Sequence, residues 1–208
     1  HEVGHTLGLN HNMKASSSIS LEELHDMDRA QKEGLIPSVM DYAPINLAPE
    51  GVKQGKFFSD VPGLYDHWAI EFGYTPSLDD PDAEAKRQKD LLAKSLDPKL
   101  TFGNDADDMR SAFAGIDPRT NVGDLSSDLV GWTEQQIDIV DSLEKSIMET
   151  FRKEGASWEG VKRGYYIARY FKVGALLRLT PLVGGIHVER GVTELFTEAQ
   201  TPLTPVSR

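Results

Sequence analysis

The feature that most limits how this chain can fold is the spacing of three histidines in its first eleven residues, HEVGHTLGLNH. His1 and His5 are four residues apart, so on an α-helix of 3.6 residues per turn they project about 40° apart and can reach one ion. Gly8 suits the left-handed turn that ends a helix, and a reversal there lets His11 supply a third nitrogen. The spacing therefore predicts a helix over residues 1 to 8, a reversal, and a three-histidine metal site.

The residue types available indicate which metal this site takes. The chain has no cysteine, which excludes disulfides and every thiolate zinc site. Three histidines leave the fourth position of a tetrahedral zinc open for water, as in catalytic rather than structural zinc sites. Glu2 falls beside the helical histidines, where a carboxylate can take a proton from that water. We therefore expect Zn²⁺ held by His1, His5 and His11, with Glu2 as general base.

Three other interpretations of these residues are open. The histidines could be ordinary surface residues, although the full spacing argues against chance. The amine of an N-terminal His1 could chelate copper together with a ring nitrogen, which would leave Glu2 and Gly8 unexplained. The chain could also be a non-catalytic binding or scaffold module with a structural or degenerate zinc site, but a structural site needs no base.

The first eleven residues resemble the long zinc signature of the metzincin metallopeptidases, His-Glu-x-x-His-x-x-Gly-x-x-His. That family places a methionine turn beneath the metal, and SVMDY at residues 38 to 42 is similar to it. The resemblance implies that Met40 forms an apolar floor under the imidazoles without binding zinc. It also implies that the Tyr42 hydroxyl approaches the metal and stabilises the oxyanion, as in the astacin and serralysin groups. The alternatives are a core methionine and a buried tyrosine whose hydroxyl bonds to a backbone carbonyl.

Three later segments, GLYDHWAIEFGY, TFGNDADD and VGGIHVERG, resemble those that follow the metzincin core in a group of large, poorly characterised bacterial zinc-dependent metalloproteases. The resemblance implies an extracellular, periplasmic or cell-envelope location, and residues 43–50 bordering the pocket for the substrate side chain after the scissile bond. Because proteins of that group extend far upstream, we expect an upstream part of the same polypeptide to complete the domain. We expect weak or absent peptidase activity from this chain alone.

Hydrophobic periodicity predicts a mainly α-helical chain with little strand. Besides the first helix, the patterns predict helices at 20–34, 59–74, 81–96, 125–153 and 157–180, and a strand within 184–192. The last helix is apolar most of the way round, so we expect it to be buried, with Tyr165, Tyr166, Tyr170 and Phe171 in the core. We expect residues 1–75 to be the C-terminal half of a metzincin-like catalytic domain and residues 76–208 to be a helical extension.

Charge and hydropathy narrow the choice of partners. The formal net charge of -11, from 22 basic and 33 acidic residues, argues against nucleic acid, since phosphate binding needs a cationic face. No apolar run approaches the roughly 18–20 residues of a membrane span. We therefore expect a peptide or protein substrate.

Other polar residues receive no role at this stage. His25, His67 and His187 lack a partner at ligand spacing, which favours a structural role for each. Residues 101–124 are rich in Asp, Asn and Gly and predict a long surface loop. Its acidic cluster could gather around calcium, but the EF-hand glycine and distal glutamate are missing, which favours a solvated loop for Asn104, Asp105, Asp107 and Asp108.

Overall fold

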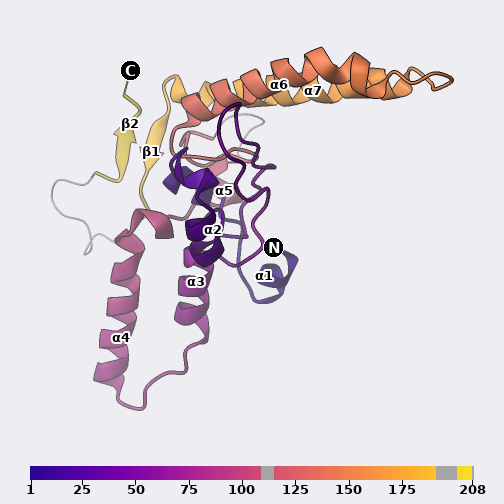
Figure 1. Ribbon diagram of the computed structural model, residues 1–208. Helices are drawn as coiled ribbons and strands as arrows, with labels where there is room; N and C mark the ends of the chain where they lie inside the picture. Colours follow the sequence, from indigo (N-terminus) through magenta and orange to yellow (C-terminus); the bar gives the residue numbers. More distant parts are fainter. Residues whose placement is uncertain (109–114, 191–200, 208) are drawn as a thin grey trace.

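The computed structural model describes residues 1–108, 115–190 and 201–207 (Figure 1). The chain is mainly α-helical, as predicted. The α-helices are α1 (Glu2–Thr6), α2 (Met27–Glu33), α3 (Leu64–Tyr74), α4 (Pro81–Ala93), α5 (Asp105–Asp108), α6 (Leu129–Phe151) and α7 (Glu159–Leu177). Short 3-10 helices cover Ala15–Ser18, Glu23–His25, Lys94–Leu96, Pro98–Leu100 and Thr180–Leu182. The strands β1 (Ile186–Val188) and β2 (Leu203–Pro205) pair antiparallel, with His187 opposite Thr204.

Aspartate side chains cap several of the helices. Asp26, Asp80 and Asp128 precede α2, α4 and α6, and each accepts a hydrogen bond from a backbone N–H in the first turn. Such a cap satisfies one of the free donors at a helix start and stabilises the helix by about 1 kcal/mol. These caps determine where the helices begin, and each depends only on residues that are neighbours in the sequence.

The predicted helix over residues 20–34 is divided in two. Ser20 and Glu23 do form a reciprocal capping box, with the Ser20 N–H donating to Glu23 Oε2 at 2.9 Å. The turn that follows is a 3-10 helix, and Asp26 then adopts an extended conformation and caps α2. A second capping residue within the segment thus interrupts the helix that periodicity alone predicts.

The main hydrophobic core joins residues 19–36 to residues 125–132. Residues from the loops around α2 pack with residues at the start of α6, and the cluster comprises Ile19, Leu24, Leu35, Ile36, Leu125, Leu129 and Trp132. The division of the chain near residue 75 stays a prediction, but apolar contacts cross it. The loops around α2 therefore depend on residues 125–132, from a distant part of the chain, for their support.

Helices α6 and α7 form a long antiparallel hairpin that extends away from the rest of the molecule (Figure 1). Val140 and Ile147 of α6 pack against Val161 and Ala168 of α7. The prediction that α7 is buried is wrong, because only the face toward α6 is covered over much of its length. Apolar residues all around a helix indicate that several of its faces could be buried, but they do not show which faces pack against another element.

The aromatic residues of α7 show most clearly that much of this helix is exposed. Tyr166 and Tyr170 are 72% and 70% exposed, and Tyr165 and Phe171 are also exposed. None of the four belongs to the core in which we expected them. They lie on the faces of α7 that α6 leaves uncovered.

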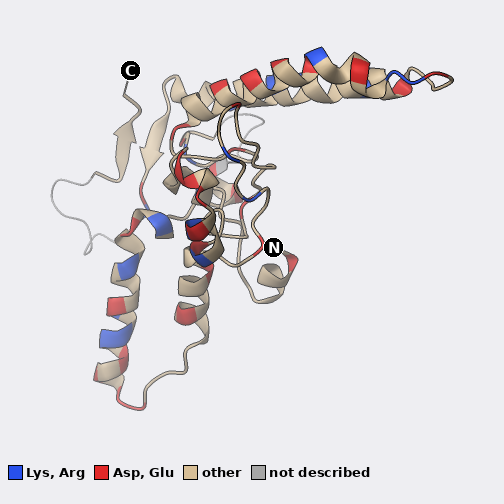
Figure 2. Ribbon diagram, viewed as in Figure 1, with Lys and Arg blue, Asp and Glu red and all other residues tan. Residues whose placement is uncertain are grey.

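A second helical pair, α3 and α4, projects from the opposite side of the molecule (Figure 1). Trp68 of α3 donates from Nε1 to the carbonyl of Leu91 at 2.9 Å. Leu91 is the one buried residue of α4, and charges of both signs run along the helix (Figure 2). None of the described helices is both long and apolar enough to cross a membrane.

The interpretation of residues 101–124 as a surface loop is wrong for much of the segment. It contains α5, and Asp117, Thr120, Asn121 and Asp124 are all buried. Residues 109–114 lie outside the described residues. The polar residues that suggested solvent instead satisfy buried hydrogen bonds within the fold.

Candidate metal centre

The three predicted ligands converge on one point. His1 is the N-cap of α1 and His5 lies in its last turn, and Gly8 reverses the chain with a φ of +83°, in the left-handed region that favours glycine. The Nε2 atoms of His5 and His11 lie 3.1 Å apart. One nitrogen from each of the three rings lies within 4.8 Å of the others. The local geometry that the spacing predicts is therefore present.

The outer nitrogen of each imidazole is bound to an oxygen. The three pairs are His1 Nδ1 with the Val39 carbonyl (2.8 Å), His5 Nδ1 with the Leu9 carbonyl (3.0 Å) and His11 Nδ1 with the Asp105 carboxylate (2.8 Å). Carbonyls and carboxylates accept hydrogen bonds, so each Nδ1 carries the ring proton and donates it. Each Nε2 is then left with the lone pair that a metal needs.

These residues fit a zinc ion. Zinc–nitrogen distances of about 2.0–2.1 Å in tetrahedral geometry put the ligand nitrogens roughly 3.4 Å apart, and the His5–His11 separation is close to this. His1 Nε2 is buried and has no hydrogen-bond partner among the described residues. An orphaned buried nitrogen is costly unless something binds it, and it is aimed at the other two rings.

Met40 lies directly beneath α1. Its side chain is fully buried, and a Cβ built on Gly4 would lie 2.3 Å from Met40 Sδ. The Met40 carbonyl also accepts a hydrogen bond from the N–H of Asn12, the residue after the third histidine, at 3.0 Å. The glycine between the two helical histidines is therefore what allows the methionine to approach, a requirement that sequence reasoning missed.

A buried carboxylate holds the methionine turn in place. Asp66, in the first turn of α3, is 4% exposed. It accepts hydrogen bonds from Ser38 Oγ at 2.6 Å, from the Val39 N–H at 2.9 Å and from the Gly63 N–H at 2.8 Å. Since Val39 supplies the carbonyl that orients His1, Asp66 acts on the metal centre through the turn. Nothing in the local sequence links Asp66 to residue 38.

The two predicted catalytic residues lie at the edge of the cluster. Glu2 is exposed and makes no hydrogen bond or ion pair with the described residues. Tyr42 is 46% exposed, its ring packs against His1 and His11, and its hydroxyl lies 3.0 Å from His11 Nε2. The hydroxyl thus faces the Nε2 side of the histidine cluster and not a backbone carbonyl. The catalytic roles of Glu2 and Tyr42 stay predictions.

Asp105 is a further residue of the centre that the sequence interpretation assigned to solvent. Both its carboxylate oxygens lie within 2.9 Å of His11 Nδ1. Asp107, two residues later, forms an ion pair with Arg190 instead. Asp105 and Asp107 thus bind a histidine and an arginine, and among the described residues only the three histidines form a group that could hold a metal.

Buried charges support the loop that carries the third histidine. Lys14 pairs with Asp117 at 3.2 Å, and both side chains are nearly inaccessible. Burial lowers the pKa of Lys14 in spite of this pair. Burial opposes ionisation of Asp117 too, but hydrogen bonds from Arg119 and the charge of Lys14 outweigh it and lower its pKa to about 2. The loop is thus fixed by an ion pair to a residue of the region expected to be an extension.

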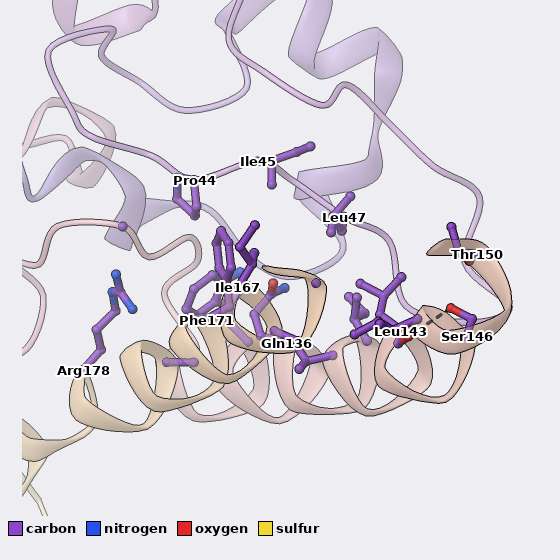
Figure 3. Close-up of a pocket in the computed structure, with 18 of the residues that line it drawn as sticks. Pro44, Ile45, Leu47, Gln136, Leu143, Ser146, Thr150, Ile167, Phe171 and Arg178 are labelled. Carbon is purple, nitrogen blue, oxygen red and sulfur yellow. Dashed lines mark hydrogen bonds between the residues drawn. The ribbon is translucent and has the colours of Figure 1, made fainter. Parts of the chain in front are cut away.

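An apolar pocket of about 450 Å³ begins two residues beyond Tyr42 (Figure 3). It lies between residues 44–47 and the α6–α7 hairpin, and its lining includes Pro44, Ile45, Leu47, Leu143, Ile167 and Phe171. Gly123, which also lines it, donates from its N–H to the Tyr42 carbonyl at 3.0 Å. The segment after the methionine turn therefore forms one wall of a pocket, and the hairpin forms the other.

Comparison with known protein families places the chain as follows. Residues 1–208 match a family described as Met-zincin. No match was found among curated proteins or among solved structures.

Proposed function

The chain belongs to the Met-zincin family, and from that premise we propose that it is the zinc-binding part of a metalloendopeptidase that hydrolyses peptide bonds with Glu2 as its general base. The family is one of zinc metallopeptidases in general. The specific mechanism, the site residues and the substrate belong to this proposal.

One observation carries the proposal. Each of the three histidines has its outer nitrogen bound to an oxygen and its inner nitrogen directed at the same point. A chance cluster of histidines would not share one tautomer and one direction. Fixed outer-nitrogen bonds of this kind are what orient histidine ligands in zinc enzymes.

The residues supply the remaining parts of a hydrolytic site. Bound by His1, His5 and His11, zinc supplies a Lewis acid that lowers the pKa of water to about 7 and polarises a carbonyl. The Glu2 carboxylate, exposed and unpaired among the described residues, accepts the proton of the attacking water and returns it to the leaving amine nitrogen. The Tyr42 hydroxyl donates a hydrogen bond to the charge that develops on the substrate carbonyl oxygen.

The apolar pocket supports a substrate preference. Its volume lies in the range that holds a large side chain, and apolar residues dominate its lining. The proposal assigns it to the substrate side chain that follows the scissile bond, which is then aliphatic or aromatic. The proposed location outside the cytoplasm rests on family resemblance alone.

Replacing Glu2 with Gln tests the proposal. In the complete natural polypeptide, Glu2→Gln removes the base but none of the three ligands, so zinc content by elemental analysis stays at that of the unmodified protein. Hydrolysis of an unstructured protein substrate falls by at least about a hundredfold, the usual contribution of a positioned general base. Equal hydrolysis by both proteins, or no hydrolysis by either, supports the scaffold alternative instead.

A further inference from the structure

We infer that Asp105 is a positioning residue of the metal centre, which fixes the orientation and the proton of His11 and thereby raises the affinity of the site for zinc. The inference rests on the proposed function only in requiring that the three histidines bind the metal. Of the three groups that face the outer nitrogens of the histidines, two are neutral backbone carbonyls. The third is a carboxylate from a residue 94 positions along the chain from His11.

The chain places Asp105 by clamping the preceding residues to the loop of the third histidine. Asn12, fully buried, accepts at Oδ1 from the Gly103 N–H at 3.1 Å and donates from Nδ2 to the Thr101 carbonyl at 3.0 Å. The Met13 N–H donates to the Gly103 carbonyl at 2.7 Å. Residues 101–103 therefore follow residues 12–13 closely, and Asp105 begins α5 next to His11.

Gly103 allows this close approach. A Cβ at this position would lie 2.7 Å from Thr120 Oγ1 and 3.1 Å from the Lys14 Cβ, both of which are buried. Only a residue without a side chain fits between the ligand loop and residue 120 at these distances. The contact between Asp105 and His11 is thus built by several independent packing constraints and is not a chance meeting of two surface side chains.

A carboxylate acts on a ligand histidine in two ways. It holds the proton on Nδ1, so that Nε2 keeps its lone pair, and its negative charge increases the electron density that the ring offers to a cation. Both Asp105 oxygens lie at hydrogen-bonding distance, 2.9 and 2.8 Å from Nδ1, so small rotations of the carboxyl group do not break the contact. Removal of such a partner typically weakens metal binding by about 10–100-fold.

The test compares two carboxylates of the same short helix. Zinc dissociation constants are measured by competition with a chromophoric chelator for the 208-residue chain and for Asp105→Ala, Asp105→Asn and Asp107→Asn. Asp105→Ala weakens zinc binding by about 10–100-fold, and Asp105→Asn, which keeps an acceptor but loses the charge, weakens it less. Asp107→Asn, which alters only the contacts of Asp107 with Arg190 and the Asn104 N–H, leaves the constant unchanged.

The outcomes separate this inference from the proposed function. Zinc binding by Asp105→Ala that equals the unmodified chain overturns the inference and leaves the proposed peptidase intact. An equal loss in Asp107→Asn also overturns it, because the effect would then come from the folding of α5. Failure of the unmodified chain to bind zinc overturns this inference, and the same failure in the complete natural polypeptide also refutes the proposed peptidase.

A measurement on the unmodified chain guards against a variant that does not fold. In nitrogen-15 NMR spectra of the zinc-loaded protein, His11 carries its proton on Nδ1, and that proton exchanges more slowly with solvent than a free ring proton because a carboxylate binds it. A proton on Nε2 of His11, or an Nδ1 proton that exchanges as fast as that of an exposed histidine, contradicts the inference whatever the variants do.

Discussion

Asp66 offers the sharpest test of how the methionine turn is held. Its carboxylate accepts three hydrogen bonds, from Ser38 Oγ, the Val39 N–H and the Gly63 N–H, in a site that is 4% exposed. Asp66→Ala leaves three donors unsatisfied, each at a cost of about 1–3 kcal/mol, of which relaxation and entering water recover part. We expect a loss of about 3–5 kcal/mol in the free energy of unfolding, a large share of the stability of an ordinary domain.

Asp66→Asn is the informative comparison. Its single carbonyl oxygen can still accept from Val39 and Gly63, which share one oxygen of the native carboxylate, and its NH₂ group can donate to the Ser38 hydroxyl. The expected loss is therefore smaller, about 1–2 kcal/mol. Urea denaturation at pH 7, followed by far-UV circular dichroism without zinc, measures both values against Glu71→Ala in the same helix, which removes an exposed ion pair with Lys94. An Asp66→Ala variant as stable as Glu71→Ala would refute the reasoning.

Three further predictions concern other parts of the chain. Although alanine favours helices, Gly4→Ala places a Cβ 2.3 Å from Met40 Sδ, and we expect it to lower the free energy of unfolding by about 1–3 kcal/mol, as measured by thermal unfolding. Val3→Ala, on the exposed side of α1, is the control and should not lower it. The pKa of Asp117 is lowered to about 2 in the folded chain, against about 3.9 in the unfolded chain. The ionised carboxylate therefore stabilises the fold above a pH of about 3.9 by an amount on the order of 2 kcal/mol, and this stabilisation disappears as the pH falls from about 4 to about 2. Asp117→Asn should therefore flatten the dependence of unfolding free energy on pH between about 4 and 2, and an unchanged slope would contradict the assignment. Leu143→Trp fills the apolar pocket, so kcat/KM should fall more for peptides with a large side chain after the scissile bond than for peptides with alanine at that position. An unchanged ratio of these two kcat/KM values would exclude the pocket from substrate binding.

The convergence of the three histidines could be predicted from the sequence because it depends on local geometry. Helical spacing brings His1 and His5 to one face, and a glycine that can adopt positive φ turns the chain back to His11. The spacing within the first eleven residues is enough to predict that arrangement, although residues further along the chain hold it in place. The methionine turn was also found, but only through its resemblance to a known motif.

The residues that orient the ligands could not be predicted, because their contacts span large separations in sequence. Asp66 lies 28 residues from Ser38, and Asp105 lies 94 residues from His11. Both are aspartates in the first turn of a helix, where a capping role is the ordinary expectation. Only the tertiary arrangement shows that one of them holds a turn and the other a ligand.

The error over α7 has a different origin. Its periodicity correctly predicts a helix with a buried face, and Val161, Ala168 and Ala175 form that face. Tyr166 and Tyr170 instead stay largely exposed, and Ile167 and Phe171 line the apolar pocket. The pattern of apolar residues shows which faces of a helix could be buried. Whether they are buried depends on which other elements pack against the helix in the folded chain.

The same long-range contacts explain why the metal centre draws on the whole chain. His11 is hydrogen-bonded to Asp105, and the loop after it is tied through Lys14 to Asp117. Leu35 and Ile36, just before the methionine turn, pack in a core shared with Trp132 of α6. A zinc site needs its ligands held within a fraction of an ångström, and five residues of helix cannot supply that rigidity by themselves. The region after residue 75, which the sequence alone suggests is an appendage, therefore supplies the contacts that hold the histidine loop in position, and metal affinity should respond to changes there as directly as to changes around the histidines.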